Sequence, residues 1–160
     1  MIEIFQINIG TKLSSIRLKC IDNIKKFASK NNYKYKMICA DPDPNIMIRS
    51  SQADIIRHEY ASKNPYALYC DTDLELNGLP DFESGRPYFA RYKSRRVDAF
   101  LFYVNNCCSF FENLLNEGYI KRPDMARDWI AALLRDKKDD VYVIENEHFV
   151  HYGLRGEGYD

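Results

Sequence analysis

The chain has 160 residues, of which 46% are hydrophobic, and it carries 23 basic (Lys and Arg) and 23 acidic (Asp and Glu) residues. This size predicts a single domain, because such a chain buries roughly two thirds of its unfolded surface around one core. The balanced charge argues against nonspecific binding of nucleic acid. No apolar run is long enough for a transmembrane segment, and residues 1–10 lack the pattern of a signal peptide.

The cysteines indicate a reducing environment. They are odd in number, contain no CxxC motif and fall mostly inside apolar segments, as small hydrophobic residues do. We therefore expect free thiols and a cytoplasmic protein. The cysteines are Cys20, Cys39, Cys70, Cys107 and Cys108.

The first 40 residues predict a β-α-β unit. Residues 2–9 alternate apolar and polar side chains, and in residues 13–28 the apolar side chains recur at helical spacing. Residues 33–40 form a second strand-like run. Such a unit favours parallel strands joined by a right-handed crossover. We expect an α/β fold with a mostly parallel, Rossmann-like sheet flanked by helices.

Ligands of α/β sheets bind where the strands end. The first strand ends near Gln6, Ile7, Asn8 and Gly10, so these residues are candidates for holding a nucleotide base and ribose.

A second helix is expected to begin at a capping box, Ser51-Gln52-Ala53-Asp54, and to run to about Ser62. Asp54, Arg57 and His58 then share one side of it. A cap with a surface ion pair would explain this spacing equally well. Spacing alone does not decide which end of the helix faces the ligand.

Residues 66–70 read as a buried central strand that ends in two acids, Asp71 and Asp73. Side chains alternate along a strand, so both acids project from the same edge and Thr72 faces away. Two adjacent carboxylates repel each other unless a cation lies between them, and a hard divalent cation with oxygen ligands suits the site. The alternative is an acidic turn closed by residues 77–78.

The second half predicts a hairpin and more helices. Two strand-like runs, 87–92 and 97–104, flank a basic turn, Lys93-Ser94-Arg95-Arg96, which is typical of a solvated hairpin tip. Helical patterns follow over residues 109–116 and from Pro123 onward.

The chain then ends with a strand over residues 141–144 and a segment, 149–153, that returns toward the sheet. The remainder is rich in glycine. We expect a compact domain over residues 1–152 and a flexible tail or lid over residues 153–160.

Taken in order, six residues resemble the donor site of metal-dependent glycosyltransferases with the GT-A fold. The likeness is to glycogenin-like and lipopolysaccharide galactosyltransferase-like enzymes, and to clostridial glucosyltransferase toxins and their DXD sugar-binding relatives. The residues are Ser51, Asp54, Arg57, Tyr69, Asp71 and Asp73.

The resemblance implies a role for each residue. Asp73 would bind Mn²⁺ or Mg²⁺ directly, and Asp71 would contact the metal shell, the ribose or the sugar. Asp54 and Arg57 would hold hydroxyls of the donor sugar, with Tyr69 beside them. The site would then bind a nucleotide-diphosphate sugar.

The C-terminal stretch Phe149-Val150-His151-Tyr152-Gly153-Leu154-Arg155 is similar to the end of such enzymes. It implies that His151 is the third protein ligand of the metal and that Arg155 contacts the diphosphate, with His148 as the next candidate ligand. Asp128 matches the acid that faces the reacting sugar.

The implied function is sugar transfer from a nucleotide sugar, with UDP as the expected nucleotide, to an unknown glycan, lipid or protein acceptor with retention of configuration. Two alternatives stay open. One is a catalytically silent nucleotide-sugar-binding module, and the other is a phosphotransferase of the haloacid dehalogenase type, in which the first Asp is a nucleophile.

Overall fold

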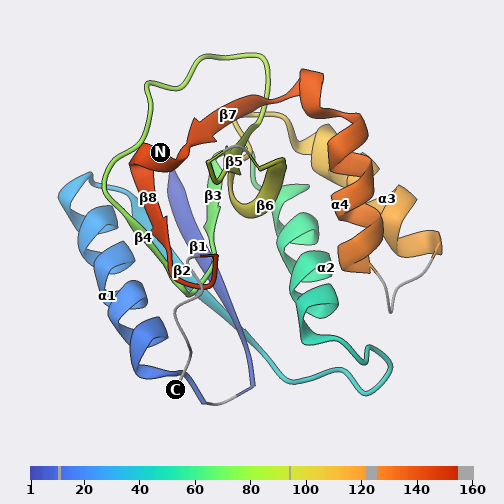
Figure 1. Ribbon diagram of the computed structural model, residues 1–160, viewed down its shortest axis with the longest axis horizontal. Helices are drawn as coiled ribbons and strands as arrows, with labels where there is room; N and C mark the ends of the chain where they lie inside the picture. The colour runs from blue at the N-terminus through green and yellow to red at the C-terminus, as the bar shows by residue number, and fades with distance from the viewer. Residues whose placement is uncertain (11, 94, 122–125, 155–160) are drawn as a thin grey trace.

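The computed structural model describes residues 1–10, 12–93, 95–121 and 126–154, with the backbone alone for residues 119–121 and 126–128. A six-stranded sheet forms its centre (Figure 1). The strands, in the spatial order β2-β1-β3-β6-β5-β7, are β1 (Glu3–Ile9), β2 (Lys34–Ala40), β3 (Ala67–Cys70), β5 (Tyr88–Arg91), β6 (Val97–Tyr103) and β7 (Tyr142–Glu145).

Within this sheet β1 pairs in parallel with β2 and β3, and β5 pairs in parallel with β7. Only β6 runs antiparallel to its neighbours, β3 and β5. The sheet is therefore mixed and mostly parallel, as the sequence predicts, and the β5–β6 hairpin with its basic turn is confirmed.

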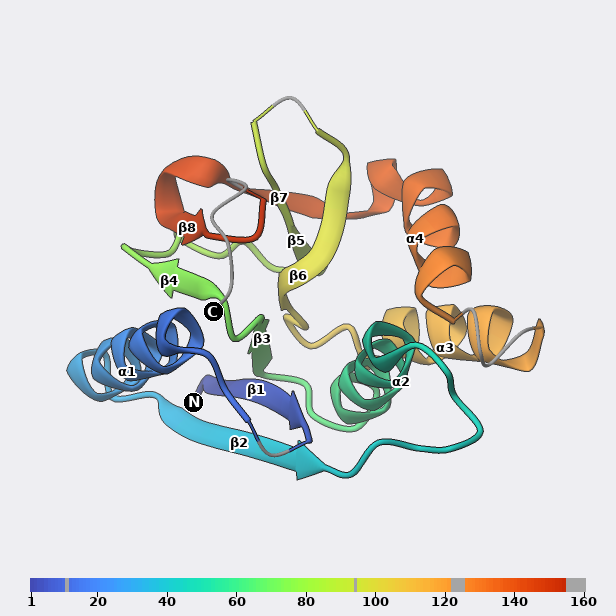
Figure 2. The same cartoon turned by 60° about the horizontal axis from the view of Figure 1, so that its bottom comes forward.

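In the described part of the chain, four α-helices cover the sheet, and Figure 2 shows α1 apart from the other three. They are α1 (Ser15–Lys30), α2 (Arg49–Ala61), α3 (Cys108–Lys121) and α4 (Ala126–Asp136). One apolar cluster joins Ile24 of α1 to Ile4 and Leu68 on one face of the sheet. A second cluster joins α2, α3 and α4 to the opposite face. Among the described residues, no helix is both long and apolar enough to cross a membrane.

The start of α2 differs from the expected capping box. The helix begins at Arg49, and Ile48 occupies the N-cap position without any side-chain cap. Ser51 is buried inside the first turn. The Gln52 side chain instead accepts a hydrogen bond from the backbone N–H of Asp43 at 3.0 Å. Tertiary contacts to the preceding loop thus override the local capping pattern.

A short strand, β4 (Leu74–Leu76), is the main element that the sequence interpretation missed. It pairs antiparallel with β8 (Phe149–His151) in a second, two-stranded sheet. The described residues also include two short 3-10 helices, η2 (Lys138–Asp140) and η3 (Asn146–His148). The alternation Leu74-Glu75-Leu76 was the available signal, but three residues are too few to distinguish a strand from a turn.

Candidate functional site

The two acids lie directly after β3, at the edge where the parallel strands end. The backbone N–H of Asp71 donates to the carbonyl of Phe100 on β6 at 2.8 Å, and its carbonyl accepts from Gln6 Nε2 at 3.2 Å. Asp73 is almost fully buried, and its carbonyl accepts from the N–H of Tyr152 at 3.0 Å. Hydrogen bonds between Gln6, Phe100 and Tyr152 and the backbone of Asp71 and Asp73 therefore fix the turn that carries both carboxylates.

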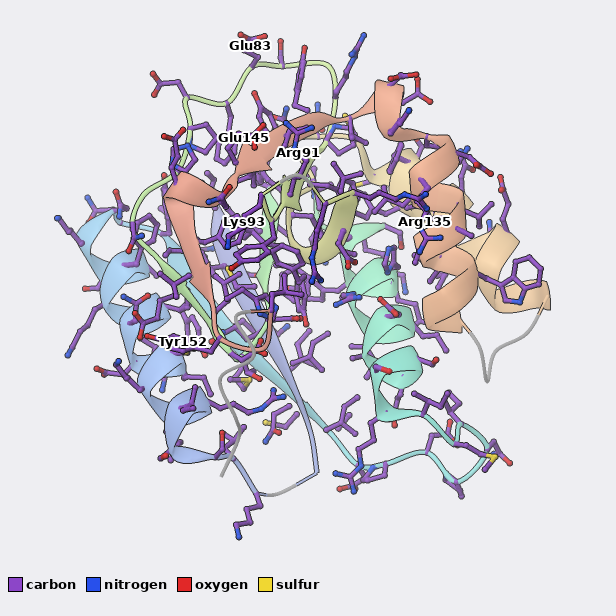
Figure 3. The ribbon with its side chains drawn as sticks, in the orientation of Figure 1. Glu83, Arg91, Lys93, Arg135, Glu145 and Tyr152 are labelled. Carbon is purple, nitrogen blue, oxygen red and sulfur yellow. The ribbon has the colours of Figure 1, made fainter. Side chains whose placement is uncertain are left out.

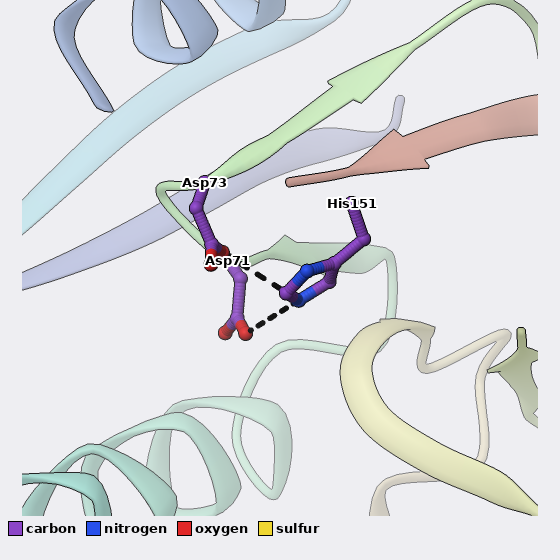
Figure 4. A group of neighbouring side chains, drawn as sticks. All are labelled: Asp71, Asp73 and His151. Atoms are coloured by element: carbon purple, nitrogen blue, oxygen red, sulfur yellow. Dashed lines mark hydrogen bonds and ion pairs between the residues drawn. The ribbon is translucent and has the colours of Figure 1, made fainter. Parts of the chain in front are cut away.

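His151 joins the two acids from the far end of the chain. It is the last residue of β8 and pairs with Leu74 on β4, which directly follows Asp73. Its Nε2 lies 3.4 Å from Oδ2 of Asp71 and 3.5 Å from Oδ1 of Asp73 (Figure 4). Its ring forms an edge-to-face pair with the ring of Phe100, with ring centroids 4.8 Å apart.

These three side chains suit a divalent cation. Each offers one ligand atom, and the three ligand atoms lie within 4.8 Å of one another. Two carboxylate oxygens and one imidazole nitrogen form a donor set that accepts Mn²⁺ or Mg²⁺. Within the described part of the chain, no other group of His, Cys, Asp or Glu residues converges in this way.

The charges around the metal-ligand candidates shift the pKa values of Asp71 and His151. Burial raises the pKa of Asp71, but the His151 ring and the Arg57 guanidinium outweigh burial and hold that pKa below its ordinary value of 3.8. Burial lowers the pKa of His151, yet its hydrogen bond to Asp71 and the charges of Asp71, Asp73 and Asp98 raise it above 6.5. Without a cation, the ring thus holds positive charge readily between the two acids.

A second set of side chains extends from Asp71 to the start of α2. Arg57 forms an ion pair with Asp54, and its Nη1 lies 3.4 Å from Oδ1 of Asp71. The hydroxyl of Tyr69 donates to the same Oδ1 at 2.7 Å. The side chains of Asp54 and Arg57 are only 2% and 11% exposed, so this is a buried pair and not the surface pair of the alternative interpretation.

One donor of this arrangement has no hydrogen-bond partner among the described residues. The Nε of Arg57 is buried without a hydrogen bond in the described structure. Burial and the nearby Asp71 raise the pKa of Tyr69 well above 10, so its hydroxyl remains a neutral donor. An Arg–carboxylate pair with spare donors can bind the hydroxyl groups of a sugar.

His58 belongs to the core rather than to the site. Its Nδ1 lies 2.6 Å from the carbonyl of Asp54, and its ring packs against Phe102 and Phe111. Burial, with a smaller effect of Arg57, lowers its pKa well below 6.5 and keeps it uncharged.

Both sets of side chains line one cavity of about 670 Å³. The N-terminal end of α2 lies on its wall, which settles the orientation that the sequence left open. Ile7 and Asn8 also line it, whereas Gln6 lies beneath the wall, fully buried, and accepts a hydrogen bond from the Tyr35 hydroxyl. Gln6 thus supports Asp71 from below.

Four charged wall residues were missed by the sequence interpretation: Lys12, Arg17, Arg49 and Asp98. Arg17 hydrogen-bonds the hydroxyl of Thr72, which lies between the two acids in the sequence. No motif identifies these residues, because they come from four separate segments: the loop after β1, and α1, α2 and β6. The position of Lys12 just after the first strand was the only signal.

Three sequence candidates remain: Arg155, Asp128 and His148. Arg155 and the side chain of Asp128 lie outside the described residues. His148 faces Glu147 at 3.7 Å and is absent from the Asp71–Asp73–His151 group. The five cysteines are all free, as expected.

The fold resembles solved glycosyltransferases. A glycosyltransferase involved in glycosylating the major capsid of PBCV-1 matches with a TM-score of 0.61 and 13% identity, over 94% of this chain and 92% of that one. The catalytic domain of Drosophila β1,4-galactosyltransferase 7 in complex with xylobiose matches with a TM-score of 0.56 and 12% identity, over 94% and 71% of the two chains.

A mutant of that Drosophila enzyme, in complex with manganese, UDP-Gal and xylobiose, matches with a TM-score of 0.57 and 14% identity, over 97% of this chain and 74% of that one. The sequence matches no protein-family model and no curated protein. The protein therefore has the GT-A glycosyltransferase fold, and at these identities the likeness establishes the fold alone.

Proposed function

We propose that the protein is a metal-dependent glycosyltransferase that takes its sugar from a UDP-sugar. The observation that carries this proposal is the convergence of Asp71, Asp73 and His151 in a cavity that also contains the Asp54–Arg57 pair. The binding of manganese and UDP-Gal by a structural neighbour supports the choice of cofactor and nucleotide.

The chain would hold the cofactor through Asp73 and His151, with Asp71 in contact with the metal shell, the ribose or the sugar. A bound Mn²⁺ or Mg²⁺ supplies positive charge where the departing diphosphate gains negative charge. Lys12, Arg17 and Arg49 carry further positive charge on the cavity wall. These three side chains are suited to binding the diphosphate.

Asp54 and Arg57 would orient the donor sugar. In the reaction, the bond between the sugar carbon and the phosphate oxygen breaks, and the nucleotide diphosphate leaves with the electron pair. The oxygen of an acceptor hydroxyl forms the new bond to that carbon, and its proton passes to the departing diphosphate or to solvent. Fixed donors and acceptors lower the barrier by positioning the sugar before this step.

Several finer assignments belong to the same proposal. Ile7 and Asn8 would contact the base and ribose, Asp128 would face the reacting sugar, and Arg155 would add to the diphosphate site. Residues 1–152 would form the catalytic domain and residues 153–160 a tail or lid. We also propose a glycan, lipid or protein acceptor, retention of configuration and a cytoplasmic location.

The test is release of nucleotide diphosphate from a panel of nucleotide sugars, with Mn²⁺ or with EDTA. We expect Mn²⁺-dependent release from at least one UDP-sugar. A thermal-shift screen of the same panel identifies the donor, since a ligand at a hundredfold excess over its dissociation constant stabilises the fold by about 2.7 kcal/mol. Binding without release indicates a silent module, and phosphate incorporated on an aspartate indicates a phosphotransferase.

A further inference from the structure

A second cavity, of about 720 Å³, lies between the β5–β6 hairpin and the C-terminal half of α4. We call it the basic cleft. Two of its cations, Arg91 on β5 and Arg135 on α4, are labelled in Figure 3. The cationic side chains on its wall are Arg91, Arg95, Arg96, Arg135 and Lys138.

The cleft concentrates positive charge in a chain whose net charge is zero. Among the described residues of the wall, two acids, Asp136 and Asp139, accompany the five cations. Arg91 forms an ion pair with Glu145. The other four cations have no ion-pair partner in the described part of the protein. Like charges gathered in one hollow repel each other, so an anion bound among them would stabilise the fold.

The basic turn that sequence analysis assigned to a solvated hairpin tip is held in place. The N–H of Lys93 donates to Oδ1 of Asn146 at 3.2 Å, and the N–H of Arg95 donates to the carbonyl of Tyr92 at 3.0 Å. Lys93 itself has a positive φ of 52°. Arg95 and Arg96 are exposed, as expected for a solvated tip, and both line the cleft on the side opposite α4.

The basic cleft and the donor cavity lie on opposite sides of β6. Val97 lines the basic cleft, and the next residue, Asp98, lines the donor cavity. Successive side chains of a strand point to opposite faces, which explains this division. The two cavities thus meet at neighbouring residues of one strand.

We propose that the basic cleft is a second binding site, which takes a phosphate-bearing group of the acceptor. The role of this ligand as a sugar acceptor rests on the proposed transferase function. The binding of phosphate to the cleft does not depend on that function. Arginine presents a planar fork of N–H donors that matches two phosphate oxygens, and four of the five cations here are arginines.

The direct test is calorimetry with inorganic tripolyphosphate in EDTA, which leaves the donor site without metal. We expect binding to the wild type and about tenfold or greater weakening in Arg95→Gln/Arg96→Gln, because each lost charge-assisted contact accounts for about that factor. The matched control, Lys34→Gln/Lys63→Gln, removes the same charge from exposed positions elsewhere and should bind as the wild type does.

Three results would overturn the proposal: absence of binding, equal weakening in the matched control, and loss of binding in Lys12→Gln/Arg49→Gln, which removes two cations from the wall of the donor cavity. The last would place the anion in the donor cavity. The melting temperature without anion checks that Arg95→Gln/Arg96→Gln is folded, and relief of repulsion should leave it unchanged or higher. Tripolyphosphate should raise the melting temperature of the wild type and not of this variant.

Two further probes separate the sources of the phosphate. A hexose 1-phosphate represents a soluble acceptor, and vesicles containing phosphatidic acid represent a lipid-linked one. Binding of either probe that depends on Arg95 and Arg96 supports the site, and binding of neither overturns it. None of these measurements uses the nucleotide-sugar donor. The basic cleft can therefore bind phosphate even if the protein has no transferase activity, and a negative result here does not contradict the proposed donor site.

Discussion

The imidazole Nε2 of His151 lies 3.4 Å from Oδ2 of Asp71, although 80 positions separate the two residues in the sequence. The pairing of β8 with β4 produces this contact, because β4 directly follows Asp73 and His151 lies opposite its first residue, Leu74. The pairing of these two three-residue strands thus brings His151 to Asp71 and Asp73, the two acids that follow β3. A shift in the register of the β4–β8 pair would therefore displace His151 from the two acids.

Substitution of Asp73 tests the metal site. Asp73→Asn keeps the shape of a side chain that is almost fully buried and removes its charge. We expect Mn²⁺ binding to be lost and the fold to be retained. Calorimetry with Mn²⁺ and with the UDP-sugar measures the loss.

The matched control is Asp41→Asn, which neutralises an exposed acid in the other pair with the same spacing, Asp41 and Asp43. Its Mn²⁺ affinity should equal that of the wild type. Equal affinity of Asp73→Asn and the wild type, with Mn²⁺ and with EDTA alike, would sink the metal assignment.

Sequence reasoning located the acids because a buried strand cannot carry charge cheaply along its length, so Asp71 and Asp73 must lie at its exit. It located His151 only through resemblance, since no local pattern connects residue 151 to residue 71. It missed β4 and the cavity-wall cations because these depend on how distant segments pack. The capping box at Ser51 was wrong for the same reason.

Arg57 is expected to recognise the sugar rather than the nucleotide. Arg57→Ala would leave Asp54 buried without its partner, which typically costs about 3–5 kcal/mol of stability. Arg57→Lys keeps the charge and removes the planar fork, so it is the cleaner change. We expect about tenfold weaker binding of the UDP-sugar, the effect of one lost charge-assisted hydrogen bond.

Binding of UDP alone is the internal control for Arg57→Lys. It should change little, because the nucleotide lacks the hydroxyls that Arg57 would contact. An equal loss for UDP and for the UDP-sugar would instead assign Arg57 to support of Asp71, from which its Nη1 is 3.4 Å away.

The pair of His151 and Asp71 predicts how the stability of the metal-free protein depends on pH. The folded pKa of His151 is above 6.5, so its contribution is complete below pH 6.5 and is lost as pH rises through the folded pKa. The folded pKa of Asp71 is below 3.8, so its contribution is complete above pH 3.8 and is lost as pH falls through the folded pKa. The pair stabilises most between these two values.

Denaturant unfolding of the wild type and His151→Gln in EDTA measures this effect. The difference in unfolding free energy between them should be largest near pH 5–6, between the two reference pKa values of 3.8 and 6.5. It should shrink as pH rises toward 8. Mn²⁺ affinity should change in the opposite direction and increase over the same range, since a ligating imidazole must lose its proton. A pH-independent difference would contradict the prediction.

Metal binding should also alter the backbone just after His151. The N–H of Leu154 donates to Nδ1 of His151 at 3.2 Å, so at a pH above the folded pKa of His151, where the ring is neutral, the ring proton lies on Nε2. Nε2 is the atom that faces both acids. A metal at Nε2 requires that proton to leave, and the neutral ring then carries its proton on Nδ1. Nδ1 can no longer accept from Leu154.

We therefore expect the Leu154 amide to change its hydrogen bond when Mn²⁺ binds, which connects the metal site to the start of the C-terminal tail. Hydrogen exchange measured with and without Mn²⁺ should change at Leu154 in the wild type. It should stay constant in Asp73→Asn, which keeps His151 but lacks the site. If Mn²⁺ binds with full affinity and the Leu154 amide exchanges as before, the metal does not use Nε2, and His148 becomes the next ligand to test.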